Sequence, residues 1–378
     1  MANIMEYLKW RGDLTFSQDP LNAVDALVFS ALSYVCYAGR TAEQPNTPVR
    51  LQSAAEELFA LADHEDRCRV KSDLELLRLA ADTTRFGMSE ICMYRDEFIP
   101  EQETQFAAMT FLLDDGSMFL AFRGTDNSLV GWKEDFNMTF QQTIPAQRLA
   151  LQYTREAAME YMRPMYLGGH SKGGNLAVFA AARSSPMLQQ RIVSVFNNDG
   201  PGFTQYLMGD PGYLAMVPRI QTYIPQSSVI GMLLEHEEPY TVIRSKTVGV
   251  LQHDPYSWEV LGREFLPVEQ ITESSQFLDA TIKTWFAEMT NAERNQLVDV
   301  MFTLLGTGGV DNVHGLIQPK NIRTYIKTLS SDGNLRRLLS TEFQSLIEAA
   351  RRTKLKFEEQ RELPEAGYED EKSFGNSL

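Results

Sequence analysis

The chain has 378 residues, a net charge of −15 and a pI near 4.9, and 43% of its residues are hydrophobic. This length and composition allow a large buried core in one or two domains. The acidic balance disfavours nucleic acid as a partner, because phosphates are bound by basic surfaces. It equally disfavours electrostatic docking on anionic lipid.

The N-terminal residues lack the basic start, apolar core and cleavage site of a secretory signal. No run approaches the roughly eighteen apolar residues of a transmembrane helix. Cys36, Cys68 and Cys92 are odd in number and do not have the spacing of a metal site. We therefore expect a cytoplasmic protein with reduced thiols, no transmembrane segment, no metal and no cofactor.

Hydrophobic periodicity predicts the elements of the first part of the chain. An edge strand is expected at residues 12–16, and Asp19 is expected to cap the helix that follows, with Pro20 in its first turn. Ser72 and Glu75 form a capping box for a later helix. Further elements are helices at residues 51–61 and 72–83, strands at 93–98, 106–113 and 117–122, and a hairpin turn at 114–116.

In the second part of the chain, strands continue to alternate with helices up to residue 265. The expected elements are a helix at residues 144–162, a strand at 165–167, a helix from 176, and strands at 191–196, 219–224 and 240–244. This alternation predicts an α/β fold with a mostly parallel sheet and helices on both faces. Ligands of such folds bind at the carboxyl ends of the strands.

Three regions are expected from the change of pattern near residue 265. Residues 1–265 form the α/β domain, and residues 266–356 form a C-terminal helical region packed on it, with a capping box at Thr290 and Glu293. Residues 357–378 are charged and poor in aliphatic side chains, which predicts a flexible acidic tail.

The motif Gly169-His170-Ser171-Lys172-Gly173 follows the short strand at residues 165–167 and precedes an apolar helix. This is the pattern of a nucleophile elbow, in which a strand turns sharply into a helix and exposes a serine at the top of a sheet. The turn needs glycine at both ends, because these two residues flank a serine with a strained backbone. The same letters also occur in ordinary turns, so the assignment depends on partners elsewhere in the chain.

A serine nucleophile needs a histidine to take its proton, and the chain has five. We interpret His170 as a packing residue that points away from the serine, and His64 as solvated. His253 lies in a loop after the last predicted strand, as the chain order serine, acid, histidine requires. His253 is therefore the predicted base, and His236 and His314 remain alternatives.

The best candidate for the acid is Asp199, at the end of the strand that follows the elbow. An Asx turn before Gly200 is a competing role for Asp199, and Glu235 and Asp254 are alternative acids. The backbone N–H groups of Lys172 and Thr125 are the expected oxyanion-hole donors, with the Thr125 hydroxyl as a third donor.

Several motifs together resemble the class 3, fungal-type lipases of the α/β-hydrolase superfamily. They are the apolar strand leading into Arg123-Gly124-Thr125, then Trp132 and Asp135, and finally the elbow with its following Gly174. Residues 7–16, 198–203 and 252–255 are more similar to an uncharacterised bacterial lipase-like family of that superfamily. The resemblance covers residues 1–260 and implies an α/β-hydrolase fold, Ser171 as nucleophile, and Thr125 with Lys172 as oxyanion donors.

Two departures from the class 3 pattern stand out. These lipases carry their acid just after the next strand, where this chain has residues 225–230 and no carboxylate. The acid has therefore either moved to Asp199, as in other branches of the superfamily, or is missing. Lys172 replaces the usual leucine, and we expect its charge near the mouth of the pocket.

These residues predict a serine hydrolase that cleaves carboxylic esters through an acyl-enzyme, with a Ser171, His253 and Asp199 triad. The expected substrate is a small ester or an acyl lipid. A thioesterase or acyltransferase would use the same residues, and an inactive hydrolase fold that serves as a binding or scaffold module is the alternative from another class. Residues 137–147 and 229–238 are the expected covers of the pocket.

Overall fold

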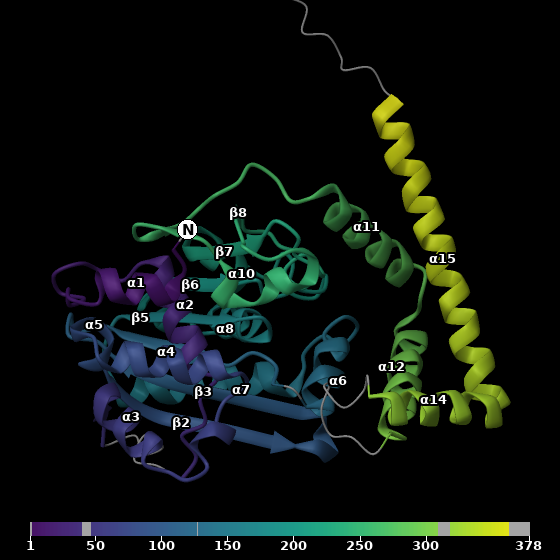
Figure 1. The fold of residues 1–378 in the computed structure, drawn as a ribbon. Helices are drawn as coiled ribbons and strands as arrows, with labels where there is room; N and C mark the ends of the chain where they lie inside the picture. Colours follow the sequence, from purple (N-terminus) through teal and green to yellow (C-terminus); the bar gives the residue numbers. More distant parts are fainter. Residues whose placement is uncertain (1, 40–46, 127, 309–317, 363–378) are drawn as a thin grey trace, which may run out of the picture.

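The computed structural model describes residues 2–39, 47–126, 128–308 and 318–362. Within this part of the chain, an eight-stranded sheet has its strands in chain order (Figure 1). The strands are β1 (Val49–Arg50), β2 (Glu90–Ile99), β3 (Thr104–Leu112), β4 (Met118–Phe122), β5 (Met165–His170), β6 (Ile192–Asn198), β7 (Ile220–Pro225) and β8 (Tyr240–Ile243). Strands β1 to β4 pair antiparallel, and strands β4 to β8 pair parallel.

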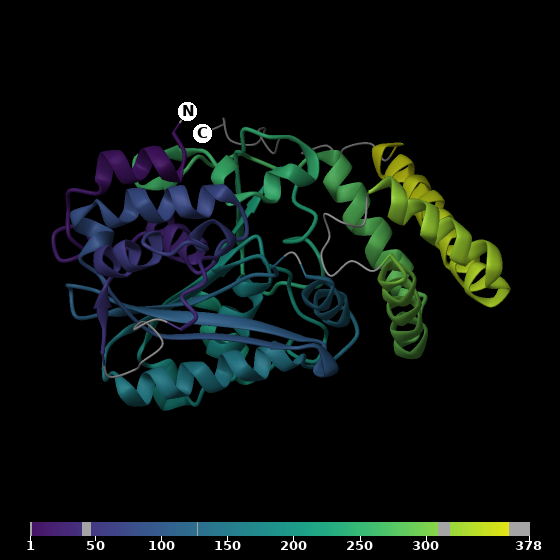
Figure 2. The ribbon, with the colours of Figure 1, turned by 60° about the horizontal axis from the view of Figure 1, so that its bottom comes forward.

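Helices cover both faces of this sheet, as Figure 2 shows. One face carries α1 (Ile4–Arg11), α2 (Ala23–Leu32), α3 (Leu51–Phe59), α4 (Lys71–Ala81) and α5 (Thr84–Gly87), and the other carries α7 (Pro145–Glu160), α8 (Lys172–Ala182), α9 (Pro186–Gln189) and α10 (Pro211–Met216). Strand β4 is buried along its whole length. Phe119 and Ala121 belong to the first core, whereas Leu120 and Phe122 belong to the second. This two-sided burial explains why the strand is apolar throughout.

The parallel register brings the carboxyl ends of β4 to β7 to one edge of the sheet. Phe122 lies opposite Gly169, and His170 lies opposite Asn198, which in turn lies opposite Tyr223. The turns after these four strands therefore meet at this edge. With helices on both faces and the serine turn between β5 and α8, the expected α/β-hydrolase fold is confirmed.

The helical C-terminal region comprises α11 (Glu273–Ala287), α12 (Asn291–Gly306), α14 (Pro319–Ser331) and α15 (Gly333–Glu362). Helix α12 contacts α6 (Leu129–Asn137), where the rings of Phe136 and Phe302 lie 5.8 Å apart. Helix α15 packs on α11 on the side away from the sheet (Figure 1), and Trp285 Nε1 donates to Ser345 Oγ at 2.7 Å. Because α15 extends to Glu362, the first residues of the expected tail are helical, and the others lie outside the described residues.

The edge strand predicted at residues 12–16 is wrong, because this segment is a series of turns around the buried Arg85. The Arg85 guanidinium donates to the carbonyl oxygens of Leu14 and Thr15 at 3.2 Å and to that of Asp19 at 2.9 Å. Carbonyl groups directed at one cation cannot also form a sheet ladder. The backbone conformation of residues 12–16 therefore depends on an arginine about seventy residues away in the sequence, and the local hydrophobic pattern cannot predict that contact.

Two predicted helix starts are also displaced. Helix α2 begins at Ala23 and is capped by Asn22, and Asp19 instead pairs with Arg11 at 2.7 Å. Helix α4 begins at Lys71, and the carboxylate of Asp73 accepts from the N–H of Val70. The capping box at Thr290 and Glu293 is confirmed at the start of α12. A small hairpin of β9 (Val260–Leu261) and β10 (Glu264–Phe265) completes the α/β part.

The ion pair of Arg85 with Asp25 ties α5 to α2 inside the core, and both side chains are fully buried. We expect Arg85→Leu to lower the free energy of unfolding by about 3 to 5 kcal/mol, because the Asp25 carboxylate would remain buried without its partner. Arg95→Leu removes a partly exposed pair with Glu156 and should cost less than about 1 kcal/mol. Urea denaturation measures both, and equal losses would contradict the assignment.

Candidate active site

Ser171 occupies the turn between β5 and α8. Its backbone has φ 59° and ψ −133°, a strained conformation for a residue with a side chain. Gly173 explains how the turn fits, since a Cβ there would lie 2.0 Å from the carbonyl oxygen of Phe122 at the end of β4. Glycine is therefore required at position 173 because the backbone approaches the neighbouring strand closely. A positive φ is not the reason.

His253 ends a short 3₁₀ helix, η5 (Gly249–His253), and its Nδ1 lies 2.6 Å from Oδ2 of Asp199. Asp199 follows β6, is fully buried and has φ 54°. Its second oxygen, Oδ1, accepts a 2.5 Å hydrogen bond from Ser228 Oγ. The Asx turn before Gly200 is made by Asn197, whose Oδ1 accepts from the Gly200 N–H at 3.0 Å. Asp199 is therefore free of that competing role and directed at His253.

Ser228 is a site residue that the sequence reasoning missed. It lies in the segment after β7, where class 3 lipases carry their acid, and it is 2% exposed. The hydroxyl also accepts from the N–H of Gly231 at 3.0 Å, which fixes its orientation toward Asp199. The sequence around Ser228 does not predict this role, because the role depends on a carboxylate that follows another strand.

Ser171 and His253 line one cavity of about 590 Å³. No hydrogen bond joins Ser171 Oγ to His253 Nε2 among the contacts of the described residues. The structure thus brings the serine and histidine to the same cavity and pairs the histidine with the carboxylate.

His170 does more than fill space next to the serine. It is fully buried, and its Nε2 lies 2.7 Å from the carbonyl oxygen of His253, with the two rings 4.6 Å apart. Because a carbonyl only accepts, Nε2 carries the proton, so Nδ1 accepts from the hydroxyl of Tyr34 at 3.0 Å. Burial lowers the pKa of His170 well below its usual value, so the ring is neutral and holds the backbone of His253.

The two expected oxyanion donors come from the start of α8 and from the turn after β4. Lys172 is the first residue of α8, where the N–H has no acceptor within the helix, and the Ser171 side chain does not cap it. Thr125 follows β4 and lines the Ser171 cavity. Its hydroxyl donates to Asp135 Oδ2 at 2.5 Å, so it is not the additional donor expected from the sequence.

The expected position of the Lys172 charge is wrong, because the side chain is 1% exposed and does not reach the pocket mouth. Its Nζ donates to Glu134 Oε2 at 2.9 Å and to the carbonyl and side-chain oxygens of Gln105 at 2.8 and 2.9 Å. The remaining Glu134 oxygen accepts from the N–H of Ala146. Lys172 therefore fastens α6 and β3 to the start of α8.

The alternative histidines and acids have other partners. His236 bonds to Glu238 and to the carbonyl of Gly231, and His64 bonds to the carbonyl of Leu61. His314 lies outside the described residues. Glu235 is exposed and lies 3.9 Å from Lys283, and Asp254 caps a 3₁₀ turn at Tyr256.

The walls of the Ser171 cavity are largely apolar and come partly from the C-terminal region. Both segments proposed as covers contribute, the first through Thr139. The main apolar lining residues are Val229, Ile230, Leu233, Ile282, Trp285 and Phe286. The last three belong to α11, a contribution that the sequence did not predict because the helix lies about a hundred residues after the serine.

Other kinds of site find little support in the described part of the chain. It contains no group of three or more His, Cys, Asp or Glu side chains placed to hold a metal ion. The three cysteines are unpaired. None of the helices in the described ranges combines the length and hydropathy needed to span a membrane.

Asp135 is a carboxylate at the cavity wall, and burial raises its pKa to about 6 despite the nearby Lys172 and the Thr125 hydrogen bond. The folded protein therefore holds this proton more tightly than the unfolded chain, and ionisation of Asp135 costs stability as the pH rises toward 7. We expect Asp135→Asn to gain stability relative to the parent by up to about 3 kcal/mol between about pH 4 and pH 7.

Urea denaturation at several pH values measures this difference. Asp126→Asn controls for the loss of one negative charge at the same cavity. A difference between Asp135→Asn and the parent that stays constant with pH would contradict the interpretation.

Comparison with solved structures finds fungal lipases. A mono- and diacylglycerol lipase from Aspergillus oryzae has 12% identity and a TM-score of 0.39, covering 73% of this chain and 92% of the lipase. Lipase from Rhizomucor miehei, in its native propeptide complex, has 13% identity and a TM-score of 0.35, covering 64% and 81%. Lipase II from Rhizopus niveus has 15% identity and a TM-score of 0.31, covering 53% and 83%.

A search of curated proteins finds no match. The model of the Mbeg1-like family matches residues 80–303, which is more than half of the chain. The matched span starts within α4 and ends within α12, so it includes the elbow, His253 and α11. The chain therefore belongs to the Mbeg1-like family.

Proposed function

We propose that this protein is a serine hydrolase that cleaves carboxylic esters through an acyl-enzyme intermediate. The observation that carries the proposal is the 2.6 Å contact of His253 Nδ1 with the buried Asp199, in a cavity that the strained Ser171 also lines. A carboxylate on Nδ1 selects the tautomer whose Nε2 is unprotonated, as a general base requires.

In the proposed reaction, His253 Nε2 takes the proton of Ser171 Oγ as the oxygen attacks the ester carbonyl carbon. The N–H groups of Lys172 and Thr125 stabilise the negative charge on the carbonyl oxygen. Collapse of this intermediate breaks the bond to the alcohol, which leaves with the proton from His253. Water, activated by His253, then attacks the acyl group and releases the acid and Ser171.

The character of the cavity supports an ester with an apolar acyl chain. Its walls combine Trp132, Phe136 and Val250 with the aliphatic and aromatic side chains of the 229–233 segment and α11. Such a surface favours apolar chains by burying them. A thioester would contact the same side chains. Only the leaving group would distinguish a thioesterase from an esterase, and only the acceptor of the acyl group would distinguish an acyltransferase from a hydrolase.

The proposal predicts that a fluorophosphonate probe labels Ser171 and that the protein hydrolyses p-nitrophenyl acyl esters. Ser171→Ala should abolish labelling, and His253→Ala or Asp199→Asn should lower kcat by about 10³-fold or more. Ser227→Ala removes another serine of the same cavity and should leave labelling intact.

Peptide mapping of the labelled protein and steady-state kinetics provide these measurements. If the folded protein neither reacts with the probe nor turns over short or long acyl esters, the hydrolase proposal fails. The binding or scaffold alternative would then take its place.

Ser228 provides a separate prediction, since it touches Asp199 and not the reacting atoms. Ser228→Ala leaves one buried carboxylate oxygen without its donor and should loosen the orientation of His253. We expect kcat to fall by roughly tenfold with little change in KM. An equal effect of Ser227→Ala, or a change in KM alone, would show that Ser228 does not position the acid.

A further inference from the structure

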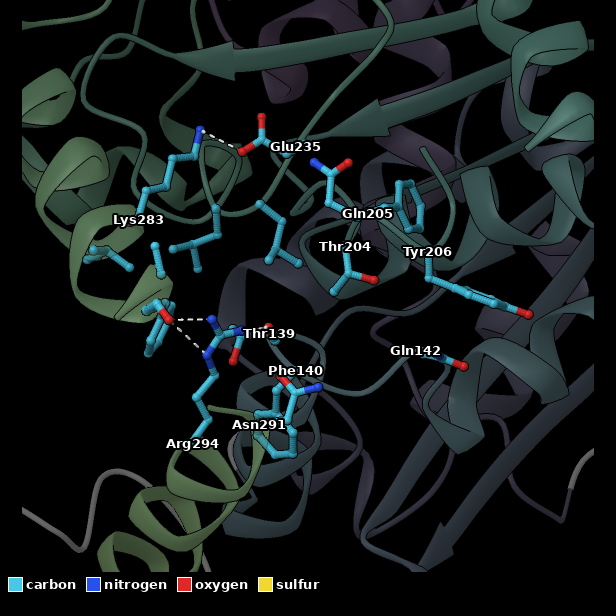
Figure 3. Close-up of a pocket in the computed structure, with 16 residues that line it drawn as sticks. Thr139, Phe140, Gln142, Thr204, Gln205, Tyr206, Glu235, Lys283, Asn291 and Arg294 are labelled. Carbon is cyan, nitrogen blue, oxygen red and sulfur yellow. Dashed lines mark hydrogen bonds and ion pairs between the residues drawn. The ribbon is translucent and has the colours of Figure 1, made fainter. Parts of the chain in front are cut away.

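A second cavity, of about 630 Å³, lies beside the Ser171 cavity between the α/β part and the C-terminal helices (Figure 3). Thr139, Leu233, Ile282 and Phe286 line both cavities. The two spaces are therefore neighbours that share these four side chains.

The shared wall on the α/β side is held by the backbone. The N–H of Gly202 donates to the carbonyl of Leu233 at 2.8 Å, and Phe203 and Glu235 exchange two hydrogen bonds at 2.8 and 3.1 Å. A Cβ on Gly202 would lie 2.1 Å from the carbonyl oxygen of Glu235. The backbone of Leu233 thus has a fixed position, and Ile282 and Phe286 of α11 line the same two cavities.

Arg294, in the first turn of α12, supplies a positive charge to the second cavity (Figure 3). Its guanidinium donates to the carbonyl oxygen of Phe286 through Nε, at 3.1 Å, and through a second nitrogen, and to that of Thr139 at 3.2 Å. Three of its five N–H groups are used in this way, so two remain for a ligand. Burial lowers the pKa of Arg294 from its usual value.

No carboxylate lies within 4.0 Å of this guanidinium among the described residues. Backbone carbonyls fix its orientation but carry no net charge that would neutralise it. Glu293, the residue before Arg294 in the helix, is directed to the cap, where it accepts from the N–H of Thr290 at 2.7 Å. The cation at this end of the cavity is therefore oriented and lacks a counter-charge, which favours an anion.

At the opposite end of the cavity the charges are paired. Lys283 lies 3.9 Å from Glu235, which also lines the cavity, and 3.2 Å from Asp279, which does not. Figure 3 shows Lys283 and Glu235 on one side and Arg294 on the other. Since the Lys283 cation already has carboxylate partners, Arg294 marks the end of the cavity that favours a negative group.

We propose that the second cavity binds the anionic end of an amphiphilic ester or of its product, with Arg294 as the anion-binding residue. The alkyl chain of such a ligand lies along Leu233, Ile282 and Phe286, which line both this cavity and the Ser171 cavity. The identification of the ligand as an ester rests on the proposed function. The anion is a carboxylate or a phosphate, because the same guanidinium donors bind both groups.

The test measures binding to the Ser171→Ala protein by calorimetry, with decanoate, decyl phosphate and decanol as probes. We expect at least one anion to bind about tenfold or more tightly than decanol, and the better of the two identifies the anionic group. Arg294→Gln in this background should lower the ratio of anion to decanol affinity about tenfold. Arg352→Gln removes an arginine that pairs with Glu288 and should keep the ratio of the parent.

A second pair of variants leaves the carbonyl contacts of Arg294 in place. Ala287 is an exposed residue of α11 that lines the second cavity. Ala287→Glu should lower the affinity for the anion more than for decanol, whereas Ala287→Gln, with the same shape and no charge, should not. This pair keeps the test decisive if Arg294→Gln does not fold.

Equal affinity of the parent for the anions and decanol would overturn the proposal, as would an unchanged ratio in Arg294→Gln or Ala287→Glu. Because Ser171→Ala cannot form an acyl-enzyme, the measurement does not depend on hydrolysis. Failure of the ester hydrolase proposal would appear in the labelling and turnover experiments, and failure of the anion site would appear only in these affinity ratios.

Discussion

The contact between the serine turn and the end of β4 is the constraint on which the site depends. Gly173 lies so close to the carbonyl of Phe122 that no side chain fits between them. The turn after β4 carries Thr125, so this approach sets Thr125 and Ser171 in the wall of the same cavity. The strain of Ser171 at φ 59° is maintained because the sheet and α8 hold both of its ends.

Two buried polar clusters connect the serine turn to the surrounding elements. Lys172 and Glu134 fasten α6, which follows the turn that carries Thr125, to the start of α8. On the other side, Tyr34, His170 and the His253 carbonyl form a chain of hydrogen bonds from α2's neighbouring loop to the histidine loop. The charged groups Lys172 and Glu134 are paired with each other, so this cluster fixes geometry without leaving an unpaired charge, although the buried Nε2 of the neighbouring Gln105 has no hydrogen-bond partner.

The C-terminal helices contribute to the site as well as to the outer surface. Helix α11 supplies walls to the Ser171 cavity and to the second cavity, and α12 brings Arg294 to the far side. The span matched by the family model includes α11. The apolar character of the first cavity and the separated charges of the second thus come from segments far apart in the sequence.

The sequence alone determined the α/β class, the elbow at Ser171, the strand leading to Thr125, and the choice of His253 and Asp199 as partners to be tested. These features can be predicted from the sequence, because the glycines of the turn, the periodicity of the strands and the order of the motifs are properties of the chain itself. Only the tertiary structure decided that Ser228 contacts Asp199, that Lys172 is buried against Glu134, and that residues 12–16 wrap around Arg85. Each of these depends on a partner from a distant segment, and a local pattern carries no information about which side chain will meet it across the core.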